Sequence, residues 1–155
     1  MEADHIEREI LIEAPVDVVW SVLTEPEQMA RWFSDAAEVD LRHGGQGVLT
    51  FNQRATNQTV VVPIQIESVD PPHTFSYRWG HPAGTEARAG NSALVEFRLT
   101  PEGTTTRLRL VESGLLEMDW SDEARTSYAE DHGKGWDMHM ASLRNYVSQQ
   151  ALAKR

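Results

Sequence analysis

The chain lacks cysteine altogether and has few basic residues for its length. Without thiols it can form no disulfide framework, no thiolate nucleophile and no thiolate metal site, and a cytoplasmic location is the default expectation. Fourteen Lys and Arg against 24 Asp and Glu give a formal net charge of -10. Nucleic acids and anionic membranes both reward clusters of Lys and Arg, so we expect neither as the main partner.

Long hydrophobic runs are also missing. No apolar run approaches the roughly 20 residues that a membrane-spanning helix needs, and the first five residues do not have the charged-then-apolar pattern of a signal peptide. A chain of 155 residues, 40% of them hydrophobic, is enough for one globular domain with a sizeable core. We therefore expect a single cytoplasmic domain over residues 1–155, with no membrane span.

The last third of the chain carries the clearest helical period. Trp136, Met140, Leu143 and Val147 follow one another at four, three and four residues and form one apolar stripe. Ser121, followed by two acidic residues, is typical of the capped start of such a helix. The stripe needs a partner, which the strands upstream would supply as a curved sheet.

Alternating apolar and polar residues predict those strands. Residues 6–13 alternate in this way, and two short amphipathic helices follow, the second with Thr24 as its expected cap and Pro26 near its start. Further strands are predicted over residues 37–41, 47–53, 60–69, 75–79, 93–99 and 104–110. The twelve residues 80–91 are rich in Gly, Ala, Pro and charge, and we interpret them as a mobile loop.

This order predicts an α+β fold, in which a strongly curved antiparallel sheet of six to seven strands grips a long C-terminal helix and two short helices follow the first strand. Four segments then resemble the START-like, helix-grip superfamily (SRPBCC), in the branch similar to the activator of heat-shock-protein ATPase. These segments are residues 13–20 (EAPVDVVW), 26–33 (PEQMARWF), 112–115 (ESGL) and 135–136 (GW). The resemblance spans residues 6–147 and implies the fold, whereas members of the superfamily include lipid carriers, receptors and aromatase/cyclases. It implies no catalytic residue.

The six histidines invite a metal or acid-base interpretation, but they are scattered and show no HExxH or comparable spacing. His132 and His139 are seven residues apart and could share a helix face, yet two ligands do not make a site. We therefore predict no metal site, no cofactor and no catalytic residue. For His139, a side chain satisfied by backbone or water is favoured over a ligand contact.

A small-molecule pocket between the sheet and the last helix is the leading hypothesis, because ligand pockets are mostly apolar with a few polar groups. The aromatic face of Phe75, Tyr77 and Trp79 is its expected wall. The predicted ligand-binding residues are Trp32, Phe51, Phe75, Tyr77, Trp79, Phe97, Trp136, His139, Met140 and Leu143. The expected partner is a small apolar or aromatic molecule, bound by a monomer or a homodimer.

Two other functions stay open on the sequence. The same pocket could fold an aromatic or polyketide-type substrate in a cyclase- or hydratase-like enzyme, with His139 or Tyr77 moving a proton. The resemblance to the ATPase activators implies a third possibility, a chaperone-associated interaction protein. Binding without catalysis is the favoured hypothesis of the three.

Overall fold

The computed structural model describes residues 5–53, 56–80, 85, 87, 91–118 and 120–153. Its elements, in chain order, are β1 (His5–Ile12), α1 (Val16–Thr24), α2 (Pro26–Trp32), β2 (Ala36–Val39), β3 (Gln46–Gln53), β4 (Gln58–Asp70), β5 (Thr74–Gly80), β6 (Ser92–Glu102), β7 (Thr105–Ser113), the short 3-10 helix η1 (Leu115–Glu117) and α3 (Asp122–Ala153). The predicted α+β class is confirmed, with seven strands, two short helices after the first strand and one long C-terminal helix. The mobile loop predicted over residues 80–91 lies largely outside the described residues.

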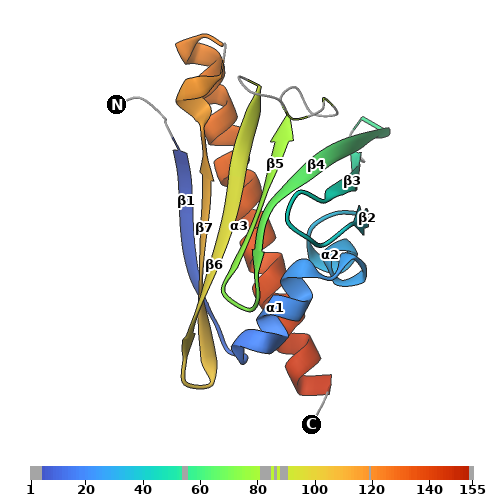
Figure 1. Ribbon diagram of the computed structural model, residues 1–155, viewed down its shortest axis with the longest axis vertical. Helices are drawn as coiled ribbons and strands as arrows, with labels where there is room; N and C mark the ends of the chain where they lie inside the picture. The colour runs from blue at the N-terminus through green and yellow to red at the C-terminus, as the bar shows by residue number, and fades with distance from the viewer. Residues whose placement is uncertain are drawn as a thin grey trace.

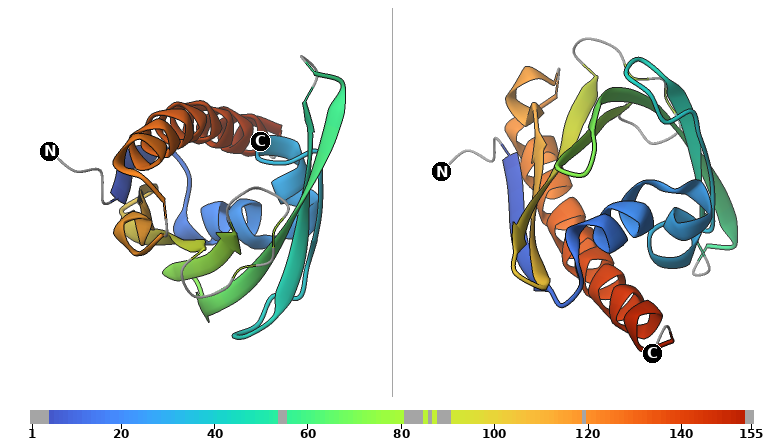
Figure 2. Two further views of the ribbon diagram at one scale, coloured as in Figure 1. Left: turned by 90° about the horizontal axis from the view of Figure 1, so that it is seen from above. Right: turned by 60° about the horizontal axis from the view of Figure 1, so that its bottom comes forward.

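The seven strands form one antiparallel sheet in the order β1-β7-β6-β5-β4-β3-β2. The first strand pairs with the last along its whole length, from His5 opposite Ser113 to Ile12 opposite Thr106. Figure 1 shows α3 running along one face of this sheet. Figure 2 shows the sheet curving so that its concave face turns toward α3, with α1 and α2 in the opening between them.

The apolar stripe of α3 is buried as its spacing predicts. Trp136, Met140, Leu143 and Val147 are each at most 2% exposed. The predicted start of the helix is also confirmed, because the Ser121 hydroxyl accepts a hydrogen bond from the Ala124 amide at 3.1 Å. Burial of this stripe, rather than helix propensity, holds a helix whose middle contains two glycines.

The predicted cap of the second helix is wrong. Thr24 ends α1, and its hydroxyl donates to the Trp20 carbonyl at 2.8 Å, so it is not free to cap α2. Glu25 precedes α2 without a side-chain capping bond, and Pro26 takes the first turn, where its missing N–H leaves no donor unsatisfied. Trp32, at the end of α2, donates from Nε1 to the Val22 carbonyl at 2.9 Å and ties the two short helices together.

The centre of the domain is tightly filled. The inward side chains of β5, β6 and β7 meet the helices there, and Phe75, Tyr77 and Phe97 are each 1% exposed. The void among them measures only about 10 Å³, about the space of a single water molecule. The middle of the fold is therefore a packed core.

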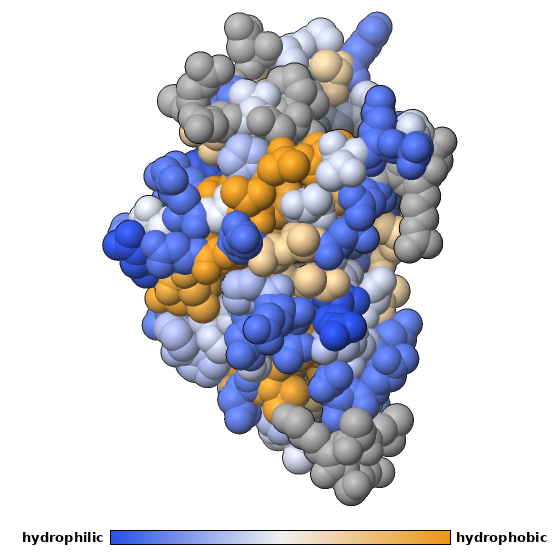
Figure 3. Space-filling view, turned by 90° about the vertical axis from the view of Figure 1, so that its right-hand side faces the viewer, coloured by the Kyte–Doolittle hydropathy of each residue, from blue (hydrophilic) through white to orange (hydrophobic). Residues whose placement is uncertain are grey.

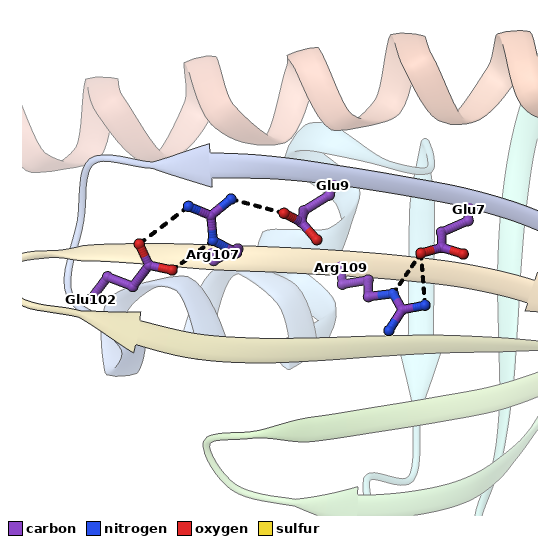
Figure 4. Close-up of polar contacts among 5 residues, drawn as sticks. All are labelled: Glu7, Glu9, Glu102, Arg107 and Arg109. Carbon is purple, nitrogen blue, oxygen red and sulfur yellow. Dashed lines mark hydrogen bonds and ion pairs between the residues drawn. The ribbon is translucent and has the colours of Figure 1, made fainter.

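The outer face of the sheet is polar where β1 meets β7. Arg109 pairs with Glu7 at 2.7 Å, and Arg107 bridges Glu9 at 2.8 Å and Glu102 at 2.6 Å (Figure 4). These pairs are exposed to solvent and screened by it, so they support the strand register more than the overall stability.

The side of the molecule formed by β2, β3 and β4 has a different character, since apolar side chains gather there among charged ones (Figure 3). Val61 on β4 and Val48 on β3 are 51% and 36% exposed.

Candidate functional site

A cleft of about 250 Å³ lies between the N-terminal half of α3 and strands β3, β4 and β5. Its aromatic and apolar lining consists of Phe33, Phe51, Val60, Val62, Trp79 and Trp136. Its remaining lining consists of Gly80, Tyr128, Asp131, His132, Gly135 and His139. The cleft is smaller than the roughly 300–1,000 Å³ of pockets that hold drug-sized ligands, so it suits a molecule of one or two rings.

Phe33, just after α2, organises the apolar wall of the cleft. Its ring stacks on Trp136 with centroids 5.5 Å apart, and it meets the Phe51 ring edge-on at 5.5 Å. Phe33 also borders the small central void, so it separates the cleft from the packed core. With Trp79, the wall therefore draws one ring each from α3, β3, β5 and the α2–β2 connection.

A fully buried carboxylate, that of Glu112 on β7, lies beside the Trp79 and Trp136 rings and is 0% exposed. It accepts hydrogen bonds from Nε1 of Trp79 at 2.8 Å and from Nε1 of Trp136 at 2.9 Å. The Tyr128 hydroxyl donates to it as well, and Nδ1 of His132 lies 3.1 Å from its second oxygen. One carboxylate thus joins β5, β7 and α3.

These contacts determine the charge of Glu112. Burial by itself would raise the pKa of this carboxyl, but hydrogen bonds and the charge of His132, together with hydrogen bonds from Tyr128 and Trp136, hold the pKa below its ordinary value. Indole N–H groups can only donate, so their partner must be an acceptor. Glu112 is therefore a buried anion at neutral pH.

The same anion acts on the nearby phenols. Burial and the Glu112 charge raise the pKa of Tyr128, so its hydroxyl keeps its proton and acts as a donor. Burial, followed by the Glu112 charge, also raises the pKa of Tyr77 far above its ordinary value. Among the residues that the structure describes, the buried Tyr77 hydroxyl has no hydrogen-bond partner, and Tyr77 lines the central void rather than the cleft. Tyr77 is therefore poorly placed to move a proton for a ligand in the cleft.

His132 forms the polar end of the cleft. Its ring stacks on Tyr128, with centroids 3.7 Å apart and an interplanar angle of 18°, and meets Trp79 edge-on at 5.8 Å. Its side chain is 32% exposed, unlike that of Glu112 behind it. A carboxylate that holds one imidazole nitrogen fixes both the ring orientation and the tautomer.

His139, one turn of helix from Trp136, is a weak base. Burial lowers its pKa to about 4, against a smaller opposing effect of the Trp32 backbone. The ring meets Phe33 edge-on at 4.8 Å and Trp136 at 5.8 Å. His139 therefore lines the cleft as a neutral ring at physiological pH.

The ten predicted ligand-binding residues fall into three groups. Phe51, Trp79, Trp136 and His139 line the cleft. Trp32, Phe75, Tyr77 and Phe97 line the central void of about 10 Å³. Met140 and Leu143, 2% and 0% exposed, lie in the packed stripe of α3 and line neither space. The pocket thus lies nearer the end of β5 and the start of α3 than the sequence prediction places it.

Sequence reasoning missed the polar part of the site, namely Glu112, Tyr128 and His132. Two signals were available. Glu112 follows Leu108 and Leu110 at two-residue intervals, so it lies on the same inward face of its strand. A carboxylate on an inward face needs buried hydrogen-bond donors. Tyr128, His132 and Trp136 recur at four-residue intervals, which places them on one face of the helix.

A metal centre finds no support in the described ranges, where no three His, Asp or Glu side chains are grouped closely enough to hold an ion. Among the helices of those ranges, none has the length and apolar content that crossing a bilayer requires.

The family described as Activator of Hsp90 ATPase homolog 1-like protein matches residues 13–148. The chain belongs to this family. The resemblance of its motifs to the helix-grip superfamily is thereby confirmed. No curated protein matches the chain.

Solved structures show the same fold. CalU16 from Micromonospora echinospora is 26% identical, with a TM-score of 0.68 over 96% of this chain and 79% of its own. A protein from Nitrosomonas europaea is 18% identical, with a TM-score of 0.79 over 96% of this chain and 97% of its own. The Aha1 dimer from Colwellia psychrerythraea is 17% identical, with a TM-score of 0.72 over 92% of this chain and 95% of its own. These likenesses concern the fold, which many functions share.

Proposed function

We propose that this member of the family binds a small aromatic or other apolar molecule, of one or two rings, in the cleft between α3 and strands β3 to β5. The observation that carries the proposal is the aromatic wall of Phe33, Phe51, Trp79 and Trp136 around a space of about 250 Å³ that opens beside polar groups. Desolvation of the ligand would supply most of the affinity, at about 25 cal/mol for each Å² of apolar surface buried.

The favoured role is binding rather than catalysis. Neither of the proton-moving groups expected from the sequence suits a reaction in the cleft, because Tyr77 lines the void and burial lowers the pKa of His139 to about 4. The buried anion Glu112 is saturated by donors from two other elements, β5 and α3, which is the arrangement of a rigid polar support. Rigid walls favour affinity because little side-chain freedom is lost on binding.

Gly135 offers a direct test. It lines the cleft, and a Cβ added at this position would meet no atom within 4 Å. A leucine there would grow into the cleft from a helical backbone that accepts it. Met138, three residues further along and 60% exposed, provides a matched position on the outer side of the same helix.

The experiment titrates the neutral fluorescent probe N-phenyl-1-naphthylamine into each protein. The parent should bind with micromolar affinity, about -8 kcal/mol, and its tryptophan emission should be quenched through Trp79 and Trp136. Gly135→Leu should lose the binding, and Met138→Leu should keep it. Native mass spectrometry of the protein purified gently from its own cells would then give the mass of any retained ligand.

A parent protein that binds no apolar probe would overturn the proposal. A chaperone-associated role, which the family description suggests, would then become the leading hypothesis. Equal binding by the parent and a folded Gly135→Leu variant would instead place the probe outside this cleft.

A further inference from the structure

His132 gives the cleft one polar atom whose chemistry can be deduced. Nδ1 of this ring lies 3.1 Å from Oε1 of Glu112, and Glu112 is an acceptor for all its other partners. A carboxylate anion cannot donate, so Nδ1 must carry the hydrogen. The charge of His132 that lowers the pKa of Glu112 belongs to the protonated ring, which has no lone pair to offer. In the neutral ring, the lone pair lies on Nε2, on the far side of the ring from Glu112.

Nε2 of His132 has no hydrogen-bond partner within the described part of the chain, although the ring lines the cleft. The ring cannot turn easily to change this, because Tyr128 stacks on one side at 3.7 Å and Trp79 meets it edge-on. The cleft therefore has a fixed acceptor at its polar end, beside apolar walls.

The surroundings favour a neutral ligand over an anion. Asp131, the residue before His132, also lines the cleft, Glu112 lies behind the ring, and the whole chain carries a net charge of -10. A carboxylate or phosphate ligand would be repelled by these charges. An uncharged hydroxyl on an aromatic ring satisfies both the walls and the acceptor.

We infer that the ligand of the cleft is a hydroxylated aromatic molecule, a phenol, whose O–H donates a hydrogen bond to Nε2 of His132. The inference rests on the proposed function and adds the chemical class of the ligand. Glu112 acts through His132 as a positioning residue, because it holds the ring in the tautomer whose Nε2 accepts a hydrogen bond. Apolar walls select the ring, and His132 selects the hydroxyl.

The test compares 2-naphthol with 2-methoxynaphthalene, which has the same ring system but no donor. Binding is measured at about pH 8. The parent should bind 2-naphthol about tenfold more tightly than the ether, the effect of one hydrogen bond that only the phenol can make. His132→Phe keeps an aromatic ring against Tyr128 and should bind the two compounds equally. His43→Phe makes the same change at an exposed histidine outside the cleft, so it is the matched control and should keep the preference.

A second measurement does not depend on a variant that folds. In the nitrogen NMR spectrum of the parent, 2-naphthol should move the Nε2 resonance of His132, whereas 2-methoxynaphthalene should not. Equal affinity of the parent for the two compounds would overturn the inference and leave the proposed function intact. A preference lost in His43→Phe but kept in His132→Phe would overturn it too. Binding of neither compound would count against the proposed function itself.

Discussion

Trp79 of β5 and Trp136 of α3 stack with ring centroids 5.7 Å apart and planes inclined by 22°. Their indole nitrogens donate to the two different oxygens of one carboxylate, that of Glu112. The pair therefore joins the sheet to the helix through both an apolar and a polar contact. The same two rings line the cleft, so the stability of the fold and the shape of the site depend on the same residues.

Trp136→Ala should reduce the free energy of unfolding by about 3–5 kcal/mol, because it leaves a large cavity under the sheet. The indole is 2% exposed, and its loss also removes one donor from Glu112. Urea unfolding of the two proteins measures the difference. Met138→Ala, on the exposed side of α3, should change stability by no more than about 0.5 kcal/mol. A loss below about 1 kcal/mol for Trp136→Ala would show that α3 does not dock through this ring.

Glu112→Gln should destabilise the protein by about 3 kcal/mol at neutral pH, because the amide directs its own N–H donors at buried donors. Burial opposes ionisation, but the His132, Tyr128 and Trp136 contacts hold the folded pKa of Glu112 below its ordinary value. Its contribution is therefore complete above the unfolded pKa of about 4.3 and is lost as the pH falls through the folded pKa.

The stability difference between the parent and Glu112→Gln should accordingly shrink below about pH 4. Unfolding by urea at a series of pH values checks this. Glu117→Gln, at an exposed site five residues away, serves as the control and should have little effect at any pH. A Glu112→Gln protein as stable as the parent at pH 7 would contradict the role of this carboxylate.

His139→Phe should reduce the fall in the free energy of unfolding that the parent shows as the pH is lowered. Burial lowers the folded pKa of His139 to about 4, whereas the unfolded chain takes up its proton near pH 6.5. Between these values the unfolded state binds more protons, so stability falls as the pH falls. The parent should lose about 2 kcal/mol from this group between about pH 7 and pH 5, and the variant should not. His43→Gln, which changes an exposed histidine, should retain the parental slope. Identical slopes for the parent and His139→Phe would refute the prediction.

Gly135→Ala should stabilise the protein by about 0.5–1 kcal/mol, because alanine is the better helix former and its Cβ enters open space. Gly133→Ala should stabilise the protein by less than Gly135→Ala. There the new Cβ would lie 2.8 Å from a guanidinium nitrogen of Arg8, which also pairs with Asp137 at 2.6 Å. Thermal unfolding ranks the two variants, and a larger gain at Gly133 would be inconsistent with the close approach of β1.

Metal chelation should leave both the melting temperature and probe binding unchanged. The described residues offer no cluster of three metal-binding side chains, and the chain has no cysteine. A melting experiment with and without excess chelator decides it, and a large drop in melting temperature would reveal a metal that stabilises the fold.

Periodicity in the sequence was enough to predict the scaffold. In β1 and β4–β7, the alternation of apolar and polar residues shows which face of each strand is buried. In α3, the buried face is shown by the four-three-four spacing of Trp136, Met140, Leu143 and Val147. These patterns are local, because burial on one side of a strand or helix repeats with the period of that element. The α+β class, the short helices and the long helix follow from such local information.

The tertiary structure alone decided which buried rings border empty space. Phe75, Tyr77 and Phe97 have the same inward phase as Trp79, yet they pack around a void of about 10 Å³, whereas Trp79 faces the cleft. Alternation reports that a side chain points inward and says nothing of how closely the opposite layer approaches. The polar site has the same origin. Glu112 meets Trp79 because the sheet places β5 two strands from β7, and it meets Tyr128, His132 and Trp136 because α3 packs across the same face. Sequence periodicity determined the faces, and three-dimensional packing determined the cavity and the partners of its buried charge.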